Sequence, residues 1–290
     1  MRKIIVLFIV MSLNLTAFAG VNAYVSILPQ KYFLEQIGRD RVNIKVMVMP
    51  GASPATYEPK PKQMTEMSSA DIYFAIDVPF EQTWLPKFAA INPEMKIVRT
   101  DDGIEKLHMA KHVHEGETEH RDGDESEIKD PHVWLDPILV MKQADNITAA
   151  LCEEDPDGCA FYKGNRDRFS VKLTKLNIEI ERILFLHKGD HFMVFHPSWG
   201  YFAERYGLEQ IPVELEGKEP KPSDLKNFVE LAKKLNLKTI FIQPQFAKRA
   251  AELIAGETGA TVATIDPLAG DWENNLITAA RAIAESQTKK

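Results

Sequence analysis

The sequence lacks the features that mark several classes of protein. Of its 290 residues only 2 are cysteine and 15 are glycine, which excludes a disulfide-stabilised scaffold and a collagen-like repeat. Lysine and arginine number 35 against 42 acidic residues, a formal net charge of -7, so no basic surface indicates a nucleic-acid partner. No HExxH or GxSxG motif indicates a hydrolase. At 44% hydrophobic, the chain can fold into one large or two medium domains.

The N-terminus has the pattern of a secretory signal peptide. Arg2 and Lys3 precede a short apolar run, which is followed by small residues around Ala19. The run is shorter than the roughly 20 residues of a membrane span. We expect residues 1–19 to be removed, with a second cleavage position after Ala23. Because no cysteine stands near either position, the sequence predicts a soluble protein of the Gram-negative periplasm, without a lipid anchor.

Beyond this segment, apolar and amphipathic stretches alternate in the way that is typical of βα units and a mostly parallel sheet. Strands are expected over 22–28, 42–49, 72–76, 95–99, 192–195, 210–215, 239–242 and 261–265. Helices are expected over 29–37, 62–69, 80–90, 137–152, 160–187, 199–206, 223–235, 247–258 and 272–286. Ser223 is the expected N-cap of its helix. The fold class is therefore α/β.

The longest of these helices divides the chain. At about 28 residues it would span about 42 Å, too long for a crossover within one sheet. We expect an N-terminal βα lobe over 20–150, a connecting helix over 151–188 and a C-terminal βα lobe over 189–290. Two lobes with mostly parallel sheets would thus be joined by a long rigid helix, which allows only modest motion between them.

The segment 108–131 interrupts the N-terminal lobe. Within it, 111–130 carries eight acidic residues against three basic ones, and nothing in it could bury a core. We expect a loop that either binds zinc loosely or is a solvated linker. Its four histidines are His108, His112, His114 and His120.

The two cysteines, Cys152 and Cys159, are seven residues apart. A straight helix would hold their Cα atoms about 10 Å apart, beyond the reach of a disulfide. The intervening Asp-Pro-Asp-Gly at 155–158 should break the helix and fold the chain back. A structural disulfide is therefore favoured over two free thiols, which remain the alternative in an oxidising compartment.

Metal-binding side chains occur where ligands of open α/β sheets bind, beyond the carboxyl ends of the strands. His196 and Asp266 each follow an expected strand, and His132 precedes the helix over 137–152. Two imidazoles and a carboxylate converging from two lobes would suit a divalent cation. Taken singly, each histidine could be a hydrogen-bonded structural residue, and Asp266 could stabilise a turn before Pro267.

Four motifs around these positions resemble those of a known family. They are Gly51-x-x-Pro54-x-x-Tyr57-Glu58-Pro59, Asp130-Pro131-His132-Val133-Trp134-Leu135, His196-Pro197-Ser198-Trp199-Gly200-Tyr201-Phe202-Ala203-Glu204-Arg205-Tyr206-Gly207-Leu208, and Asp266-Pro267-Leu268. In these motifs and their order, nearly all of the chain beyond the signal segment resembles the periplasmic zinc- and manganese-binding proteins of ABC importers, the ZnuA/TroA-like group. The His-rich segment before His132 is similar to that of the zinc-specific members.

The resemblance implies a function and a ligand set. It implies two βα lobes bridged by a long helix, with a divalent cation held between them and delivered to an ABC permease in the inner membrane. The metal ligands that carry over are His132, His196 and Asp266. This set favours Zn²⁺, although Mn²⁺ or another divalent cation is an alternative. The expected protein is a monomer and not an enzyme.

The first motif departs from the family pattern, because Ala55 stands where the family has histidine. A methyl group cannot bind a metal, so one ligand is absent. Zinc could keep a water in the open position, or Glu58 or a histidine of the 108–120 segment could replace the missing ligand. The protein could also have lost or changed its cargo.

Two other functions are compatible with these residues. One is a periplasmic metal buffer or chaperone that works through the His-rich segment. The other is a zinc hydrolase, with Glu58 or Glu214 as a general base, although no motif supports it. We interpret Glu214, together with Glu216 and Glu219, as a solvated charged surface.

Overall fold

The computed structural model describes residues 20–109, 129–214 and 220–288. The expected signal segment, 1–19, therefore lies outside the described residues. Among the helices of the described ranges, none has both the length and the apolar character that crossing a membrane would require.

The N-terminal lobe is built on a parallel sheet of four strands in the order β2-β1-β3-β4. The strands are β1 (Val21–Val25), β2 (Val42–Val46), β3 (Ile72–Ala75) and β4 (Lys96–Arg99). Every residue of β3 is buried, as expected of an apolar strand with helices on both faces of its sheet.

The C-terminal lobe repeats this design, with a parallel sheet in the order β6-β5-β7-β8. The strands are β5 (His191–Val194), β6 (Glu209–Pro212), β7 (Thr239–Ile242) and β8 (Thr261–Thr264). The β-branched and aromatic run of β7 is buried throughout, as its sequence predicts.

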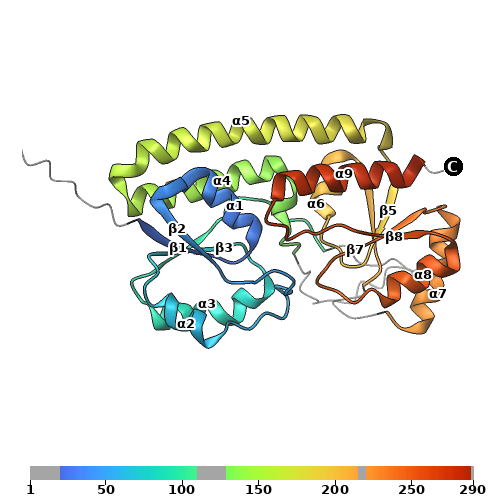
Figure 1. Ribbon diagram of the computed structural model, residues 1–290, viewed down its shortest axis with the longest axis horizontal. Helices are drawn as coiled ribbons and strands as arrows, with labels where there is room; N and C mark the ends of the chain where they lie inside the picture. Colours follow the sequence, from blue (N-terminus) through green and yellow to red (C-terminus); the bar gives the residue numbers. More distant parts are fainter. Residues whose placement is uncertain (1–19, 110–128, 215–219, 289–290) are drawn as a thin grey trace, which may run out of the picture.

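The helices cover both faces of each sheet (Figure 1). Their bounds are α1 (Leu28–Gly38), α2 (Pro61–Met67), α3 (Pro79–Ile91), α4 (Pro137–Glu154), α5 (Cys159–Leu184), α6 (Gly200–Tyr206), α7 (Pro222–Lys234), α8 (Arg249–Thr258) and α9 (Trp272–Thr288). Short 3₁₀ helices are η1 (Arg39–Arg41), η2 (Val133–Leu135), η3 (Pro156–Gly158) and η4 (Phe185–His187).

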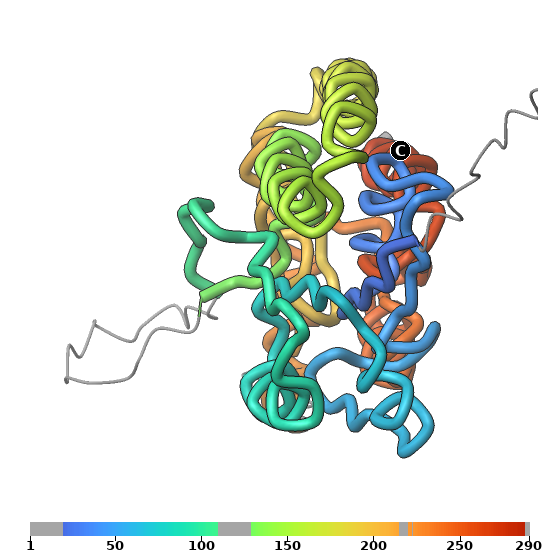
Figure 2. The backbone as a smooth tube through the Cα atoms, turned by 90° about the vertical axis from the view of Figure 1, so that its left-hand side faces the viewer, coloured from blue at the N-terminus to red at the C-terminus, as the bar shows by residue number. Residues whose placement is uncertain are grey.

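Helix α5 runs along both lobes and joins them (Figure 1). Its 26 residues correspond to a length of about 39 Å. It packs on α1, α4 and α9, and Figure 2 shows it lying over α4 in the perpendicular view. The expected fold, two βα lobes with parallel sheets joined by a long helix, is confirmed.

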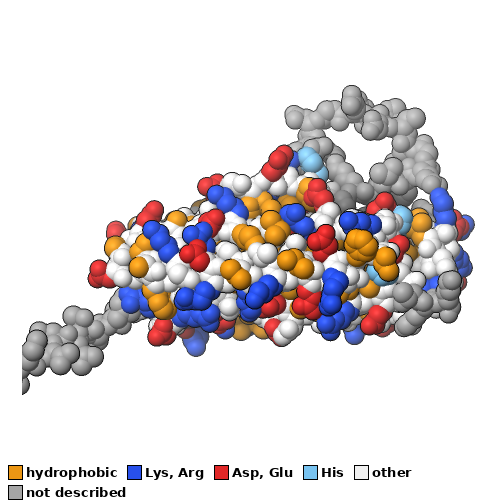
Figure 3. All heavy atoms as spheres, turned by 90° about the horizontal axis from the view of Figure 1, so that it is seen from above, with side chains coloured by type: hydrophobic (Ala, Val, Ile, Leu, Met, Phe, Trp, Pro, Cys, Tyr) orange, Lys and Arg blue, Asp and Glu red, His pale blue; other side chains and the backbone are white. Residues whose placement is uncertain are grey.

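The outward face of α5 stays in contact with solvent. Val171 and Ile178 of α5, and Phe185 at the start of η4, follow one another at intervals of seven residues and are all exposed. Figure 3 shows this side of the molecule, where apolar side chains lie among acidic and basic ones. The apolar surface of this face is therefore narrow and interrupted by charge.

A large hydrophobic cluster extends through both lobes, and a second one lies within the C-terminal lobe between β5, β7, α7 and α8. The first includes residues of β1 and β3 as well as Phe192, Phe241 and Leu276 from the C-terminal half. Two buried tryptophans cross between the halves: Trp134 donates from Nε1 to the carbonyl oxygen of Pro267 at 2.7 Å, and Trp272 donates to that of Trp134 at 2.8 Å. The lobes are thus joined by packing and hydrogen bonds as well as by α5.

The corner between α4 and α5 is covalently closed. Cys152 and Cys159 form a disulfide, with their Cα atoms 4.4 Å apart, which confirms the favoured alternative. Between them, Asp155 accepts hydrogen bonds from Tyr162 Oη at 2.6 Å and from Arg41 Nη2 at 2.7 Å. The break in the helix therefore serves as an anchor for η1 of the N-terminal lobe.

Several element bounds differ from expectation; β2, for example, ends at Val46 and not at residue 49, and β6 ends at Pro212 and not at residue 215. Helix α7 begins at Pro222, so Lys221, and not Ser223, is its N-cap. The backbone N–H of Lys221 is bound by Asp224 Oδ2 at 2.9 Å, and proline is well suited to the first turn. Strand β1 also ends earlier than expected, because α1 already begins at Leu28.

Candidate metal site

The three expected ligands each stand within two residues of the start or end of an element. His132 directly precedes η2, His196 follows β5 by two residues, and Asp266 follows β8 by two residues. The structure brings the two histidines together: their ring centroids are 5.3 Å apart, at an interplanar angle of 70°. Imidazoles from opposite halves of the chain therefore face each other.

His132 is held by Asp130. Its Nδ1 lies 2.6 Å from Asp130 Oδ1, and its backbone N–H donates to the same oxygen at 2.9 Å. Both residues are buried. Asp130 is itself fixed through its carbonyl oxygen, which accepts from Tyr201 Oη at 2.8 Å. The ring of Trp134, with its centroid 5.0 Å away, forms one wall beside His132.

His196 is held in the same way by Glu214. Its Nδ1 lies 2.6 Å from Glu214 Oε2, and Glu214 is buried. Gln243, at the end of β7, binds the His196 backbone twice, accepting from its N–H at 3.1 Å and donating to its carbonyl at 2.8 Å. The Phe246 ring stacks on the imidazole, with centroids 4.9 Å apart.

This arrangement fixes which nitrogen of each ring can bind a metal. A carboxylate can only accept, so each Nδ1 carries the hydrogen and each Nε2 keeps its lone pair. Burial lowers the pKa of the His132 imidazole; the Asp130 carboxylate opposes this effect, while the nearby His196 ring adds to it. The net lowering favours the neutral ring, which is the form that binds metals.

Asp266 is oriented by two donors that both act on Oδ1. Gln245 Nε2 lies at 2.9 Å and the backbone N–H of Leu268 at 3.0 Å. Asn275 Nδ2 holds the Asp266 carbonyl at 2.7 Å. The second carboxylate oxygen is thus the one available to a ligand. Asp266 lines a cavity of about 350 Å³ between the lobes.

The candidate ligands do not form a complete cluster. Within residues 20–109, 129–214 and 220–288, no three His, Cys, Asp or Glu side chains are grouped closely enough to hold a metal ion. The histidines form a pair, and Asp266 is not grouped with them. Ala55 and Glu58 are exposed on their loop; Tyr57 anchors that loop by donating to Gln63 Oε1 at 2.8 Å.

The accessory histidines are only partly covered by the structure. His108 forms an isolated antiparallel bridge with Lys129, and its Nε2 lies 2.9 Å from Lys129 Nζ. His112, His114 and His120 lie outside the described residues, as do Glu216 and Glu219.

Sequence reasoning missed the roles of two acidic residues. We expected Glu214 on a solvated surface, but its burial and its bond to His196 make that interpretation wrong. Asp130 was noticed only as part of a motif. For Asp130 a signal existed, because it stands two residues before His132; Glu214 is 18 residues from His196 and only the fold reveals the contact.

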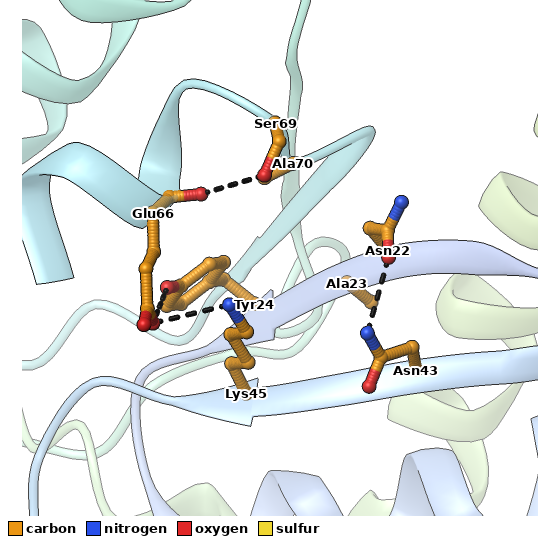
Figure 4. A pocket seen from close by; sticks show the side chains of 8 residues that line it. All are labelled: Asn22, Ala23, Tyr24, Asn43, Lys45, Glu66, Ser69 and Ala70. Atoms are coloured by element: carbon orange, nitrogen blue, oxygen red, sulfur yellow. Dashed lines mark hydrogen bonds and ion pairs between the residues drawn. The ribbon is translucent and has the colours of Figure 1, made fainter.

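A smaller hollow in the N-terminal lobe is lined by side chains that bind one another (Figure 4). It measures about 20 Å³, little more than the space that one water needs. Lys45 and Tyr24 point toward Glu66, with Nζ and Oη at 3.1 and 3.3 Å from Oε2. The charges are paired within the hollow, so it offers no free ligand set.

Known proteins are similar to this chain in fold and in sequence. A family described as periplasmic zinc-uptake complex component A matches residues 24–286. The high-affinity zinc uptake system protein ZnuA of Bacillus subtilis (strain 168) is 28% identical over 246 residues, covering 83% of this chain and 76% of that protein. The manganese-binding lipoprotein MntA of Halalkalibacterium halodurans (strain C-125) is 26% identical over 79% of this chain and 73% of its own. A crystal structure of ZnuA superposes with a TM-score of 0.86 at 42% identity, covering 93% of this chain and all of that one.

Proposed function

Because this chain belongs to the family of the periplasmic zinc-uptake complex component A, we propose that it captures a divalent cation, zinc first, for an ABC importer. It delivers the cation to a permease in the inner membrane. The family is one of transport components and not of enzymes, so zinc here is cargo. A zinc ion carried as cargo is not used for catalysis, so the hydrolase interpretation is not supported.

The observation that carries the proposal is the imidazole pair. His132 and His196 come from opposite halves of the chain, with ring centroids 5.3 Å apart. Each Nδ1 is bonded to a buried carboxylate at 2.6 Å. Such carboxylate–histidine pairs orient metal ligands and increase their basicity. We infer that the cation binds to the two Nε2 atoms.

Asp266 is the proposed third ligand, recruited when the cation binds. Its Oδ1 is occupied by Gln245 and Leu268, so Oδ2 is the atom offered. Two imidazoles and one carboxylate match the ligands that zinc accepts, with one position left open. Glu58 is exposed and is the weaker candidate. Manganese remains the alternative cargo, since MntA is named for it.

The proposed location is the periplasm, which the family description names. The basic, apolar and small-residue pattern of residues 1–19 supports export. A lipid anchor is not part of the proposal, because no cysteine stands near the expected cleavage positions. Mass spectrometry of the protein purified from the periplasm would show the mature N-terminus and any attached lipid.

Zinc titration of the mature protein tests the function. We expect saturable one-to-one binding that weakens by about a hundredfold or more in His132→Ala and His196→Ala. His187→Ala is the matched control, since His187 also binds a carboxylate through Nδ1, with Asp190 Oδ2 at 2.9 Å, yet lies in η4. Full affinity in both site variants would reject the assignment.

A variant that lacks residues 108–129 distinguishes a transport component from a metal buffer. If the pair of imidazoles is the site, tight one-to-one binding survives the deletion. If the chain is a buffer that works through its His-rich segment, tight binding disappears. Elemental analysis of the protein purified from zinc-replete cells, with anomalous scattering from crystals, would identify the cation and its ligands together.

A further inference from the structure

The first turn of helix α6 lies against the residue that orients His132. Tyr201 Oη donates to the Asp130 carbonyl oxygen at 2.8 Å. A Cβ added at Gly200 would lie 2.9 Å from Asp130 Oδ2, so glycine lets α6 begin this close without displacing the carboxylate. The other oxygen, Oδ1, is the one that binds His132. The start of α6 therefore fixes the chain two residues before His132.

The last turn of α6 holds the chain on the other side of His132. Arg205 donates from Nε and Nη2 to Asp136 Oδ2, at 2.8 and 2.7 Å. The Asp136 side chain is only 4% exposed, and its Oδ1 accepts from the backbone N–H of Ile138 at 2.7 Å, which caps α4. His132 and Asp136 flank η2. The short turn that carries this imidazole is thus bound by α6 on both sides.

The same helix is fixed relative to His196. It begins four residues after His196, and the connection between them is held by the C-terminal sheet. Gln243 donates to the His196 carbonyl oxygen at 2.8 Å, and Gln210 of β6 accepts from the backbone N–H of Trp199 at 2.7 Å. A movement of α6 would therefore change the position of one imidazole relative to the other.

We infer that α6 sets the spacing of the imidazole pair, with Arg205 as a positioning residue that acts on His132 through Asp136. The inference deepens the proposed function, on which it rests, and it involves only the two imidazoles, whose ring centroids are 5.3 Å apart. Charge-assisted hydrogen bonds from two nitrogens of one guanidinium restrict both side chains. Ligands that are held in place before a cation arrives lose less conformational entropy when it binds, which increases affinity.

A second ion pair of the same design serves as the matched control. Arg41 donates from Nε and Nη2 to Asp155 Oδ2, at 3.0 and 2.7 Å, and Asp155 Oδ1 accepts from the backbone N–H of Gly158 at 3.1 Å. Asp136 and Asp155 thus each bind an arginine with one oxygen and cap a helix with the other. Asparagine keeps the cap and loses the charge that pairs with arginine. An effect of stability alone would appear in both Asp136→Asn and Asp155→Asn.

Nuclear magnetic resonance of labelled histidine rings in the metal-free mature protein tests the spacing directly. The chemical shift of a ring proton depends on the currents of neighbouring rings, so a change in spacing moves the signals of His132 and His196. We expect these signals to move in Asp136→Asn and to stay in place in Asp155→Asn. Unmoved signals in Asp136→Asn would overturn the inference.

Zinc affinity, measured by competition with a chelator, tests the consequence. It should fall about tenfold in Asp136→Asn and in Arg205→Met and stay unchanged in Asp155→Asn. Arg205→Lys should recover part of the loss, because an ammonium group can still pair with Asp136. Equal affinities in Asp136→Asn and Asp155→Asn would overturn the inference.

A double variant separates positioning from stability. Arg205→Met leaves the buried charge of Asp136 unpaired, and adding Asp136→Asn removes that charge, so part of the lost stability should return. Zinc affinity should stay low, because the contact between α6 and the turn of His132 is still missing. Affinity that returns together with stability would overturn the inference. Absence of zinc binding in the unaltered protein would instead reject the proposed function, whatever the histidine signals show.

Discussion

Trp134 donates its indole hydrogen to the carbonyl oxygen of Pro267 across 2.7 Å. Trp134 stands two residues after His132, and Pro267 directly follows Asp266. The bond therefore ties together the two segments that carry an imidazole and a carboxylate of the candidate site, although the residues are 133 positions apart. The contact holds the two segments together across the lobes.

Trp134→Phe tests that contact. The variant leaves a buried carbonyl without its donor, so we expect the free energy of unfolding to fall by about 1–3 kcal/mol. Zinc affinity should also fall, since His132 and Asp266 lose their connection. Denaturant titration and calorimetry measure the two effects. Trp84→Phe, in the partly exposed part of α3, is the control for zinc binding and should leave it unchanged. Unaltered zinc binding in Trp134→Phe would contradict the role.

Glu214→Gln tests the carboxylate behind His196. Glutamine has nearly the same shape but no charge, so Nε2 of His196 becomes less basic and its orientation less fixed. Zinc affinity should fall by about 10- to 100-fold, measured by competition with a chelator. Glu209→Gln is the control, because Glu209 pairs with His191 at 2.8 Å on the surface. Equal affinities in the two variants would contradict the prediction.

The sequence predicted the fold well because the residue patterns that specify its strands, helices and turns are short and continuous. The run Thr239–Ile242 is a buried parallel strand, and the Asp-Pro-Asp-Gly break between the cysteines is where the chain turns back. Each depends on residues close together in the chain. The errors arose where neighbours compete: Leu28 and Pro29 start a helix that shortens β1, and Pro222 moves the cap from Ser223 to Lys221.

The candidate site was predictable only in part. The two histidines could be proposed from their places beyond strands and from the motifs around them, and the structure pairs them. The role of Glu214 could not be predicted from the sequence, since nothing in its own sequence neighbourhood distinguishes a buried carboxylate from a solvated one. Asp266 illustrates the opposite case, because its position is as expected but it is not grouped with the imidazoles.

Glu81 is predicted to make stability depend on pH. Burial raises the pKa of this carboxyl from 4.5 to about 7, although hydrogen bonds from Ser26 and the backbone of Ile76 and Asp77 oppose the rise. Between these values the folded state binds more protons than the unfolded state. Stability from Glu81 is therefore fully present below pH 4.5 and is lost as the pH rises through 7, by about 3 kcal/mol.

The comparison of Glu81→Gln with the unaltered protein isolates this contribution. Glutamine imitates the protonated carboxyl, so its variant should lack this part of the pH dependence. Urea unfolding of metal-free protein from pH 5 to pH 8 measures the difference, in which all other titrating groups cancel. If the free energies of unfolding of the two proteins varied in parallel with pH, Glu81 would be ionised in the folded state throughout this pH range, and the prediction would be wrong.

Reduction of the disulfide should weaken the fold without affecting the metal site. Cys152 and Cys159 are seven residues apart. Closing so short a loop lowers the conformational entropy of the unfolded chain and thereby raises the free energy of unfolding by about 2 kcal/mol. The Cys152→Ala, Cys159→Ala double variant should lose that amount in denaturant titration. Its zinc affinity should be unchanged, because the α4–α5 corner contacts η1 through Asp155 and Arg41 and none of the candidate ligands. A parallel loss of zinc binding would show instead that this corner fixes α4, and with it His132.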